Sequence, residues 1–332
     1  MNIRAIALAL LLCLCLTACG GEPEESGGQM SLLETAAGLD GTEHLLTIDN
    51  REIPAWRYLY WLAYTCDQIA QSYTESEVTL DWAAPVSGGT LADYAKDQAL
   101  ADTALYATVE NWAEKYGCVA EMEAQTPAAL PDLGLGQEQM QELEQVGWLY
   151  TELIKLCIEL YQLYHTADSA LAPAAEDLRT YGQEQGAITL NRILVPMGED
   201  RESASQRAAE LFSQLNSAED QTAKFSELTA GSADTLGPRT VLPGDDSLDA
   251  SLLEAAAALE EGQCSGIVES EEGFSILLRL PLDTAALMDR YFESLLASAA
   301  ENSVVTTTQA YTDLDPAAFY DAWRQGRQGS GT

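Results

Sequence analysis

The sequence predicts an α+β protein that joins a helical first part to a smaller mixed domain. Before residue 170, three long stretches repeat apolar side chains with the period of an α-helix, so each stretch presents one apolar face. After residue 187, short stretches rich in β-branched residues alternate with shorter helical patterns. A helical pattern returns after residue 285. This order favours two domains, the second of roughly a hundred residues.

The chain begins with the features of an export signal. Residues 1–4 carry a positive charge, and residues 5–16 form an unbroken apolar run. The run is too short to cross a bilayer core, which needs ~20 helical residues, but it suits the apolar region of a secretory signal. It ends in Leu-Thr-Ala-Cys at residues 16–19, which resembles the bacterial lipobox. The resemblance implies cleavage after residue 18 and a diacylglyceryl lipid on Cys19, hence an extracytoplasmic protein anchored to the cell membrane. An ordinary signal peptide with a chance cysteine is the alternative.

Composition separates a tether from folded domains. Residues 20–29 (GGEPEESGGQ) cannot bury an apolar core, and we expect residues 19–43 to form a lipidated flexible tether. An apolar content of 47% favours globular domains for the rest of the chain. The net charge of −37 repels polyanions, which excludes nucleic acid as a partner. The sequence does not indicate an oligomeric state.

We expect residues 44–186 to form a helical domain that begins with a short strand. Residues 44–52 (HLLTIDNRE) predict this strand with a turn at Asp49 and Asn50, and Pro54 suits the first turn of a helix. The helical patterns and the turn-rich loops between them cover, in order, residues 54–69, 72–89, 91–116, 122–136 and 137–164.

Residues 187–282 predict the small mixed domain. Its first strand covers residues 188–195, and its last two strands form a hairpin around a turn at residues 271–273. Helical patterns between these strands cover residues 204–215, 225–228 and 248–259. Residues 283–325 then become helical again, and we expect the tail, residues 326–332, to be disordered.

Few side chains could support metal or covalent chemistry. The only histidines are His44 and His165, which nearly excludes a histidine-based metal or nucleophile site. The cysteines beyond residue 19 match no metal or redox spacing, and whether any two of them form a disulfide stays open: Cys66, Cys118, Cys157 and Cys264. We expect neither a metal nor a cofactor.

Residues 187–281 resemble a parvulin-type peptidyl-prolyl isomerase domain. That family opens on a strand reading His-Ile-Leu-Val, continues with Phe-x-x-Leu and Leu-x-x-Gly helices, and closes on a hairpin with Ser-x-x-Val and Gly-x-His-Ile. The corresponding stretches here are residues 192–195, 225–228, 259–262, 265–268 and 273–276, which read RILV, FSEL, LEEG, SGIV and GFSI. The order and spacing of these motifs together carry the resemblance.

The flanking regions resemble foldases of the SurA and PrsA type. The helical chaperone domain of these foldases begins with Val-Asn-Gly-x-x-Ile, and residues 46–53 (LTIDNREI) are similar. In that family the helix after the isomerase domain packs back on the N-terminal helices, which implies the same for residues 283–325. The resemblance therefore implies a SurA/PrsA-like chaperone domain followed by a parvulin-like, FKBP-like α/β domain. It also implies unfolded or secreted polypeptides as partners.

The resemblance also assigns candidate site residues. The two histidines of the family are replaced here, and the loop after the Phe-x-x-Leu helix is several residues shorter. The implied catalytic positions are Arg192, Ser275 and Asp234, and the implied substrate-binding positions are Leu248, Leu252 and Phe274. With both histidines replaced, we predict that isomerase activity is weak or lost. Arg192 either donates hydrogen bonds in their stead or is a structural residue paired with an acid.

Two functions from different classes follow. The first is a membrane-anchored foldase or chaperone that binds extended segments of secreted proteins. The alternative is a non-enzymatic lipoprotein that uses the parvulin-like domain for peptide binding or structure. A solute-binding lipoprotein is disfavoured, because it would need two α/β lobes. An open apolar pocket around the site positions favours peptide binding, whereas Arg192 buried against a carboxylate, with the pocket filled, favours a structural module.

Overall fold

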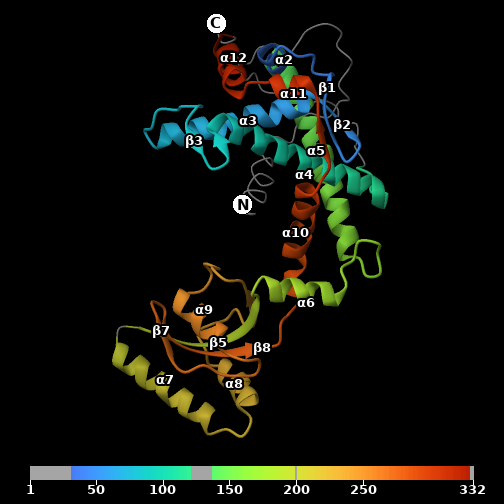
Figure 1. Ribbon diagram of the computed structural model, residues 1–332. Helices are drawn as coiled ribbons and strands as arrows, with labels where there is room; N and C mark the ends of the chain where they lie inside the picture. Colours follow the sequence, from blue (N-terminus) through green and yellow to red (C-terminus); the bar gives the residue numbers. More distant parts are fainter. Residues whose placement is uncertain (1–30, 121–136, 199, 330–332) are drawn as a thin grey trace. The chain divides into compact units, whose positions relative to one another are not determined.

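The computed structural model describes residues 31–120, 137–198 and 200–329 (Figure 1). The chain divides into two compact units. We call them the helical unit, Met1–Ala172 with Glu293–Thr332, and the sheet unit, Pro173–Phe292. The predicted signal peptide and the predicted lipid site, Cys19, lie outside the described residues. Within the described ranges, no helix has both the length and the apolar character needed to span a membrane.

The helical unit is built mainly from three long helices. Its elements, in chain order, are α2 (Leu32–Ala37), β1 (His44–Ile48), β2 (Arg51–Pro54), α3 (Ala55–Glu75), β3 (Pro85–Val86), β4 (Gly89–Thr90), α4 (Leu91–Tyr116), α5 (Gln137–His165), β9 (Val305–Thr307), α11 (Gln309–Asp313) and α12 (Pro316–Gly329). Helix α10 (Met288–Glu301) begins in the sheet unit and ends in the helical unit.

Local signals fix the ends of helix α4. The Thr90 hydroxyl accepts the Asp93 N–H, and the Asp93 carboxylate accepts the Thr90 N–H, so the helix begins with a capping box. Gly117 ends it in the left-handed conformation at φ 71°. Asp49 and Asn50 also have positive φ, which makes the tight turn between β1 and β2. The predicted strand at residues 44–52 is thus the first part of a hairpin.

Segments from both ends of the chain complete the core of the helical unit. Strand β9 pairs with β1, and the side chains of Tyr311, Phe319 and Trp323 are buried beside residues of α3 and α4. The ammonium group of Lys96 on α4 donates to the carbonyl of Leu314 at 3.0 Å. Residues 293–329 therefore belong to the helical unit, whereas residues 283–292 belong to the sheet unit.

A helix occupies part of each of the two segments that the sequence predicts to be flexible. Helix α2 falls within the predicted tether, residues 19–43. It is stabilised because Leu32 and Leu33 are buried in the core of the helical unit, and because Ser31 and Glu34 form a capping box. Helix α12 continues to Gly329, past the predicted start of the tail. Short segments with buried apolar side chains thus become helical despite polar neighbours.

The sheet unit contains one four-stranded antiparallel sheet. Its elements are α6 (Ala175–Glu184), β5 (Ile188–Pro196), α7 (Arg201–Asn216), α8 (Gln221–Thr229), β6 (Arg239–Val241), α9 (Ala250–Ala257), β7 (Val268–Ser270), β8 (Gly273–Leu280) and the 3₁₀ turn η2 (Ala285–Leu287). The strand order is β6-β5-β8-β7. Strand β6 was not predicted, because three residues are too few for a periodic pattern.

The register of β5 and β8 assigns side chains to two faces of the sheet. Arg192 lies opposite Leu277, and Leu194 lies opposite Ser275. Side chains alternate along a strand, so these four share one face with Leu190. Helix α9 covers this face, which we call the α9 face; helices α7 and α8 cover the other, which we call the α7–α8 face (Figure 1).

Candidate functional site

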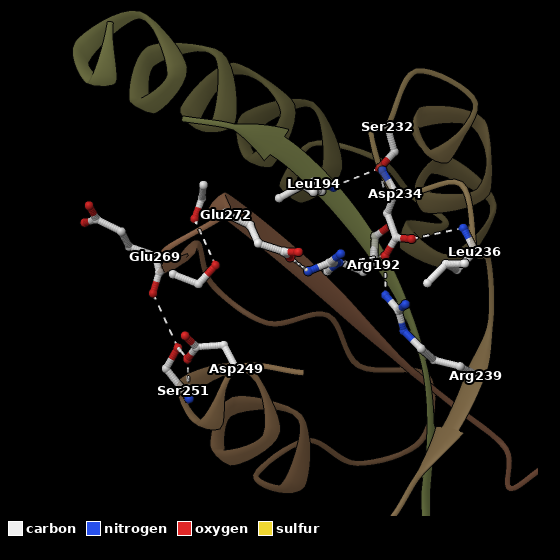
Figure 2. Close-up of polar contacts among 12 residues, drawn as sticks. Arg192, Leu194, Ser232, Asp234, Leu236, Arg239, Asp249, Ser251, Glu269 and Glu272 are labelled. Carbon is white, nitrogen blue, oxygen red and sulfur yellow. Dashed lines mark hydrogen bonds and ion pairs between the residues drawn. The ribbon is translucent and has the colours of Figure 1, made fainter. Parts of the chain in front are cut away.

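Arg192 lies on the α9 face of strand β5 and is almost fully buried. Its side chain is 6% exposed. The guanidinium Nε donates to Oδ2 of Asp234 at 2.6 Å, and Nη1 donates to Oε2 of Glu272 at 2.5 Å (Figure 2). The two acceptors differ in exposure, since the Asp234 side chain is 2% exposed and that of Glu272 is 60% exposed. Arg192 therefore bridges a buried carboxylate and one that faces solvent.

The loop after helix α8 holds Asp234 rigidly over strand β5. The Ser232 hydroxyl accepts the N–H of Leu194 at 2.8 Å and the N–H of Asp234 at 3.0 Å. The Ala233 N–H donates to the carbonyl of Leu194 at 3.1 Å. These bonds tie the loop to the strand, so the position of Asp234 is set by backbone pairing.

A second arginine shares the Asp234 carboxylate. Oδ2 of Asp234 accepts from Nη2 of Arg239 as well as from Arg192, and Oδ1 accepts the N–H of Leu236 at 3.1 Å (Figure 2). Arg239 is 14% exposed, and its buried Nε has no hydrogen-bond partner among the described residues. Two guanidinium groups around one carboxylate leave one excess positive charge, which Glu272 balances from the solvent side.

These contacts keep the buried groups ionised. Burial opposes the charged form of Arg192, but hydrogen bonds to Asp234 and Glu272 and the attraction of both carboxylates outweigh it and raise the pKa of the guanidinium. Burial likewise disfavours the Asp234 anion, but the bond from Arg192, the Leu236 N–H and the charges of Arg192 and Arg239 lower the pKa of this carboxyl.

Ser275 lies on the same face of the neighbouring strand β8. It is opposite Leu194 on β5 and opposite Val268 on β7. Its side chain is fully buried, and its hydroxyl has no hydrogen-bond partner among the described residues. Same-face diagonal neighbours on adjacent strands lie about 7–8 Å apart, so Ser275 and Arg192 share one small region of the sheet.

The expected apolar wall is packed into the core of the sheet unit. Leu248 is 7% exposed and Leu252 is fully buried. Both belong to one apolar cluster with Leu190, Val241 and other residues of the α9 face. These leucines thus fill the space between α9 and the sheet.

Phe274 is separated from the other candidate residues. It lies on the α7–α8 face, where it is packed against Ala204 and Ala208 of α7. The Arg201 guanidinium lies 5.6 Å from the centre of its ring. Arg192, Asp234, Ser275, Leu248 and Leu252 share the α9 face, so Phe274 cannot line a site with them. The reason is the strand period of two, which turns neighbours to opposite faces.

Residues 189–280 match the family model of the Rotamase, PPIC-type PPIASE domain. This segment is a PPIC-type rotamase domain. A comparison with curated proteins found no match.

Several solved structures are similar to the chain as a whole. The foldase protein PrsA from Streptococcus pneumoniae is 16% identical, with 83% of this chain and 85% of that chain covered and a TM-score of 0.27. The peptidylprolyl isomerase PrsA from Bacillus cereus is 15% identical, with 88% and 94% covered and a TM-score of 0.26. A SurA-like chaperone from Campylobacter jejuni is 13% identical, with 78% and 92% covered and a TM-score of 0.23. The assignment of the PPIC domain rests on the family model alone.

Two residues that complete the ionic cluster, Glu272 and Arg239, were not predicted from the sequence. Glu272 lies in the turn between β7 and β8, and Arg239 lies on the unpredicted strand β6. No sequence spacing links either residue to Arg192, from which they are separated by 80 and 47 positions. Only the sheet register and the pinned loop bring them together.

Proposed function

We propose that this chain is an extracytoplasmic, lipid-anchored foldase-type chaperone whose PPIC domain binds extended polypeptide and has weak or no isomerase activity. The match of residues 189–280 to the PPIC-type domain supports a polypeptide partner. The observation that carries weak or absent isomerase activity is the buried ion pair of Arg192 with Asp234. A domain of this type acts on polypeptide, and the ion pair occupies the positions where its polar groups would act.

The chemistry of prolyl isomerisation explains why this arrangement supports weak activity. Rotation about the prolyl amide meets a barrier of about 18–20 kcal/mol and involves no covalent step. A catalyst must offer a dry pocket and polar groups that favour the twisted amide. Here Nε and Nη1 of Arg192 already bind Asp234 and Glu272, and both leucines of the expected wall pack into the core.

The location proposal rests on the N-terminal sequence. Residues 1–18 have the form of an export signal, and Cys19 follows Leu-Thr-Ala as in a lipobox. The lipid on Cys19 would hold the chain at the outer face of the membrane, where secreted chains emerge unfolded. Replacement of Cys19 by Ser should move the protein from the membrane fraction to the soluble extracytoplasmic fraction. Retention in the membrane fraction would contradict a lipid anchor at this residue.

A second candidate function is a purely structural role of the PPIC domain within an interaction lipoprotein. The packing of Leu248 and Leu252 against the sheet favours it, because a filled wall leaves less apolar surface for a proline ring. In this case the domain would neither bind extended peptides nor suppress the aggregation of unfolded clients.

Two assays on the full chain separate these functions. We expect the chain to suppress aggregation of a reduced, unfolded client while accelerating a proline-limited refolding reaction by less than about twofold. Leu252→Ala and Leu215→Ala form a matched pair, because both leucines are fully buried on helices that face the sheet from opposite sides. Strong acceleration of refolding that is lost in Leu252→Ala and kept in Leu215→Ala would contradict the proposal of weak or no isomerase activity. Failure to suppress aggregation would favour the structural role.

A further inference from the structure

Without Glu272, the ionic cluster on the α9 face would have one excess positive charge and an excess of hydrogen-bond donors. Arg192 and Arg239 share one buried carboxylate, that of Asp234. The buried Nε of Arg239 and the buried hydroxyl of Ser275 have no partner among the described residues. The cluster therefore has the chemistry of an anion site, although the chain as a whole carries a net charge of −37.

Glu272 supplies the missing anion from a position that can be vacated. Its side chain is 60% exposed, whereas that of its partner Arg192 is 6% exposed. An exposed carboxylate can leave such a pair at low cost, because water replaces its lost partner. Asp234 cannot leave in the same way, since it is buried and held by a backbone N–H and two guanidinium groups.

The backbone beneath Glu272 is fixed, so only its side chain can move. The carbonyl of Glu272 accepts the Met197 N–H at 3.1 Å. The next residue, Gly273, has φ 144°, and a Cβ there would lie 2.2 Å from the Val195 carbonyl oxygen. Only glycine fits this approach of the turn to strand β5. The turn is thus held close to the end of β5 and presents the exposed carboxylate of Glu272 to Arg192.

From these observations we propose that Glu272 occupies a carboxylate-binding site, and that an extended peptide displaces it by placing its own carboxylate on Arg192. This inference rests on the proposed peptide binding by the PPIC domain and names the chemical class of the ligand. An incoming carboxylate would replace the Glu272 contact without loss of hydrogen bonds, and its second oxygen could accept from a further guanidinium N–H. The peptide carboxylate can belong to an acidic side chain or to the C-terminus.

The test uses the full chain and three fluorescein-labelled peptides of one design. The first is Gly-Ala-Leu-Pro-Glu-Leu-Ala with an amidated C-terminus, the second has Gln in place of Glu, and the third is the Gln peptide with a free C-terminal carboxylate. Fluorescence anisotropy gives the Kd of each. The first and third peptides separate a side-chain carboxylate from a terminal one, and the second measures binding that needs no carboxylate.

Glu272→Gln removes the internal competitor and keeps the shape of the side chain. We expect this variant to bind at least one carboxylate peptide about three- to fivefold more tightly than the unaltered chain, because the exposed pair of Glu272 with Arg192 no longer has to be broken. The affinity for the amidated Gln peptide should not change. The matched control is Glu271→Gln, which changes the net charge equally from the neighbouring exposed position. It should alter each Kd by less than about twofold.

Three results would overturn the inference. The first is an equal gain in Glu272→Gln and Glu271→Gln, which would show a general charge effect. The second is binding of all three peptides with equal affinity, which would leave the proposed chaperone function standing without this site. The third is no binding of any peptide. If the chain also fails to suppress aggregation, the proposed chaperone function is contradicted as well. The double variant Arg192→Gln with Glu272→Gln should lose the gain in affinity for carboxylate peptides. If this double variant does not fold, the Nε–Hε NMR signal of Arg192 in the Glu272→Gln chain must shift when a carboxylate peptide is added.

Discussion

The two faces of the sheet in the PPIC domain are built from different chemistry. On the α7–α8 face, Ile193, Ile276 and Phe225 belong to an entirely apolar cluster. On the α9 face, an apolar cluster around Leu252 adjoins the ionic cluster of Arg192 and its partners. Both faces bury apolar side chains, yet among the described residues the buried charged groups lie only on the α9 side.

The apolar clusters and the ionic cluster have different roles: the first stabilise the domain, and the second is proposed to bind a ligand. Burial of apolar area stabilises a fold directly, whereas a buried ion pair contributes little net stability after its desolvation. The apolar clusters on the two faces therefore carry most of the stability that the helices add to the sheet. The ionic cluster adds less stability, and we infer that it serves the carboxylate binding proposed above. Four predictions test this division, and they follow in order of decreasing effect.

The largest effect should come from the apolar face. Phe225 is fully buried between α8 and the sheet, so Phe225→Ala should lower the free energy of unfolding of the PPIC domain by about 3–5 kcal/mol. Hydrogen exchange of the β5 amides measures this loss. Tryptophan fluorescence serves as a separate readout of the helical unit, because all six tryptophans belong to that unit. Phe212→Ala, at a partly buried position of the same cluster, should cost less; an equal loss would contradict the assignment of the core.

Removal of the buried carboxylate should have the next largest effect. Asp234→Ala leaves Arg192 and Arg239 without their shared partner, and we expect a loss of about 3 kcal/mol by the same exchange measurement. The double variant Arg192→Met with Asp234→Leu replaces both charges by apolar groups and should recover most of this loss. A double variant as unstable as Asp234→Ala would show that the ion pair itself stabilises the domain.

Acid should weaken the ionic cluster before it affects the apolar face. Burial opposes the Asp234 anion, but Arg192, the Leu236 N–H and Arg239 hold the pKa of this carboxyl below its ordinary value. Its stabilising contribution is complete above the ordinary Asp value near pH ~3.9 and falls as the pH drops through the lowered pKa. The protection factors of the β5 amides, which are corrected for the intrinsic exchange rate at each pH, should therefore fall below pH ~4 in the unaltered chain. In Asp234→Asn this pH dependence should be smaller, and an identical dependence would exclude Asp234 as its origin.

The smallest effect should come from the exposed end of the cluster. Glu272→Gln removes a contact whose acidic partner is 60% exposed, so we expect a change in stability below about 1 kcal/mol. Thermal unfolding and hydrogen exchange should give this variant the same stability as Glu271→Gln. A loss as large as that of Asp234→Ala would mean that Glu272 is a structural partner and cannot be displaced by a peptide.

Much of the PPIC domain could be predicted from local patterns. The long strand β5, the closing hairpin and helices α7 to α9 follow from apolar periodicity and turn residues, and the family motifs placed Arg192, Ser275 and Asp234 on one site. The structure brings these three residues to one face of the sheet or to the loop above it. The resemblance implied Phe274 as a further position of this site, but Phe274 adjoins Ser275 on strand β8, and adjacent residues of a strand point to opposite faces.

Other features depend on contacts that no local pattern encodes. Helix α2 is formed by six residues beside a polar linker, and its two leucines gain stability only from a core that includes α12. Strand β6 has three residues and exists because Val241 pairs with Ile188 across the sheet. Such short elements have weak propensities of their own, so distant partners decide whether they form.

The sequence by itself determined the division into helical and sheet-bearing parts and the PPIC-type motifs. It left open whether Arg192 is a free donor or the partner of an acid. Only the tertiary structure decided this, by bringing Asp234, Arg239 and Glu272 around one guanidinium. The physical reason is range: periodicity and turn chemistry act between near neighbours, whereas the charge balance of a buried arginine depends on residues tens of positions away.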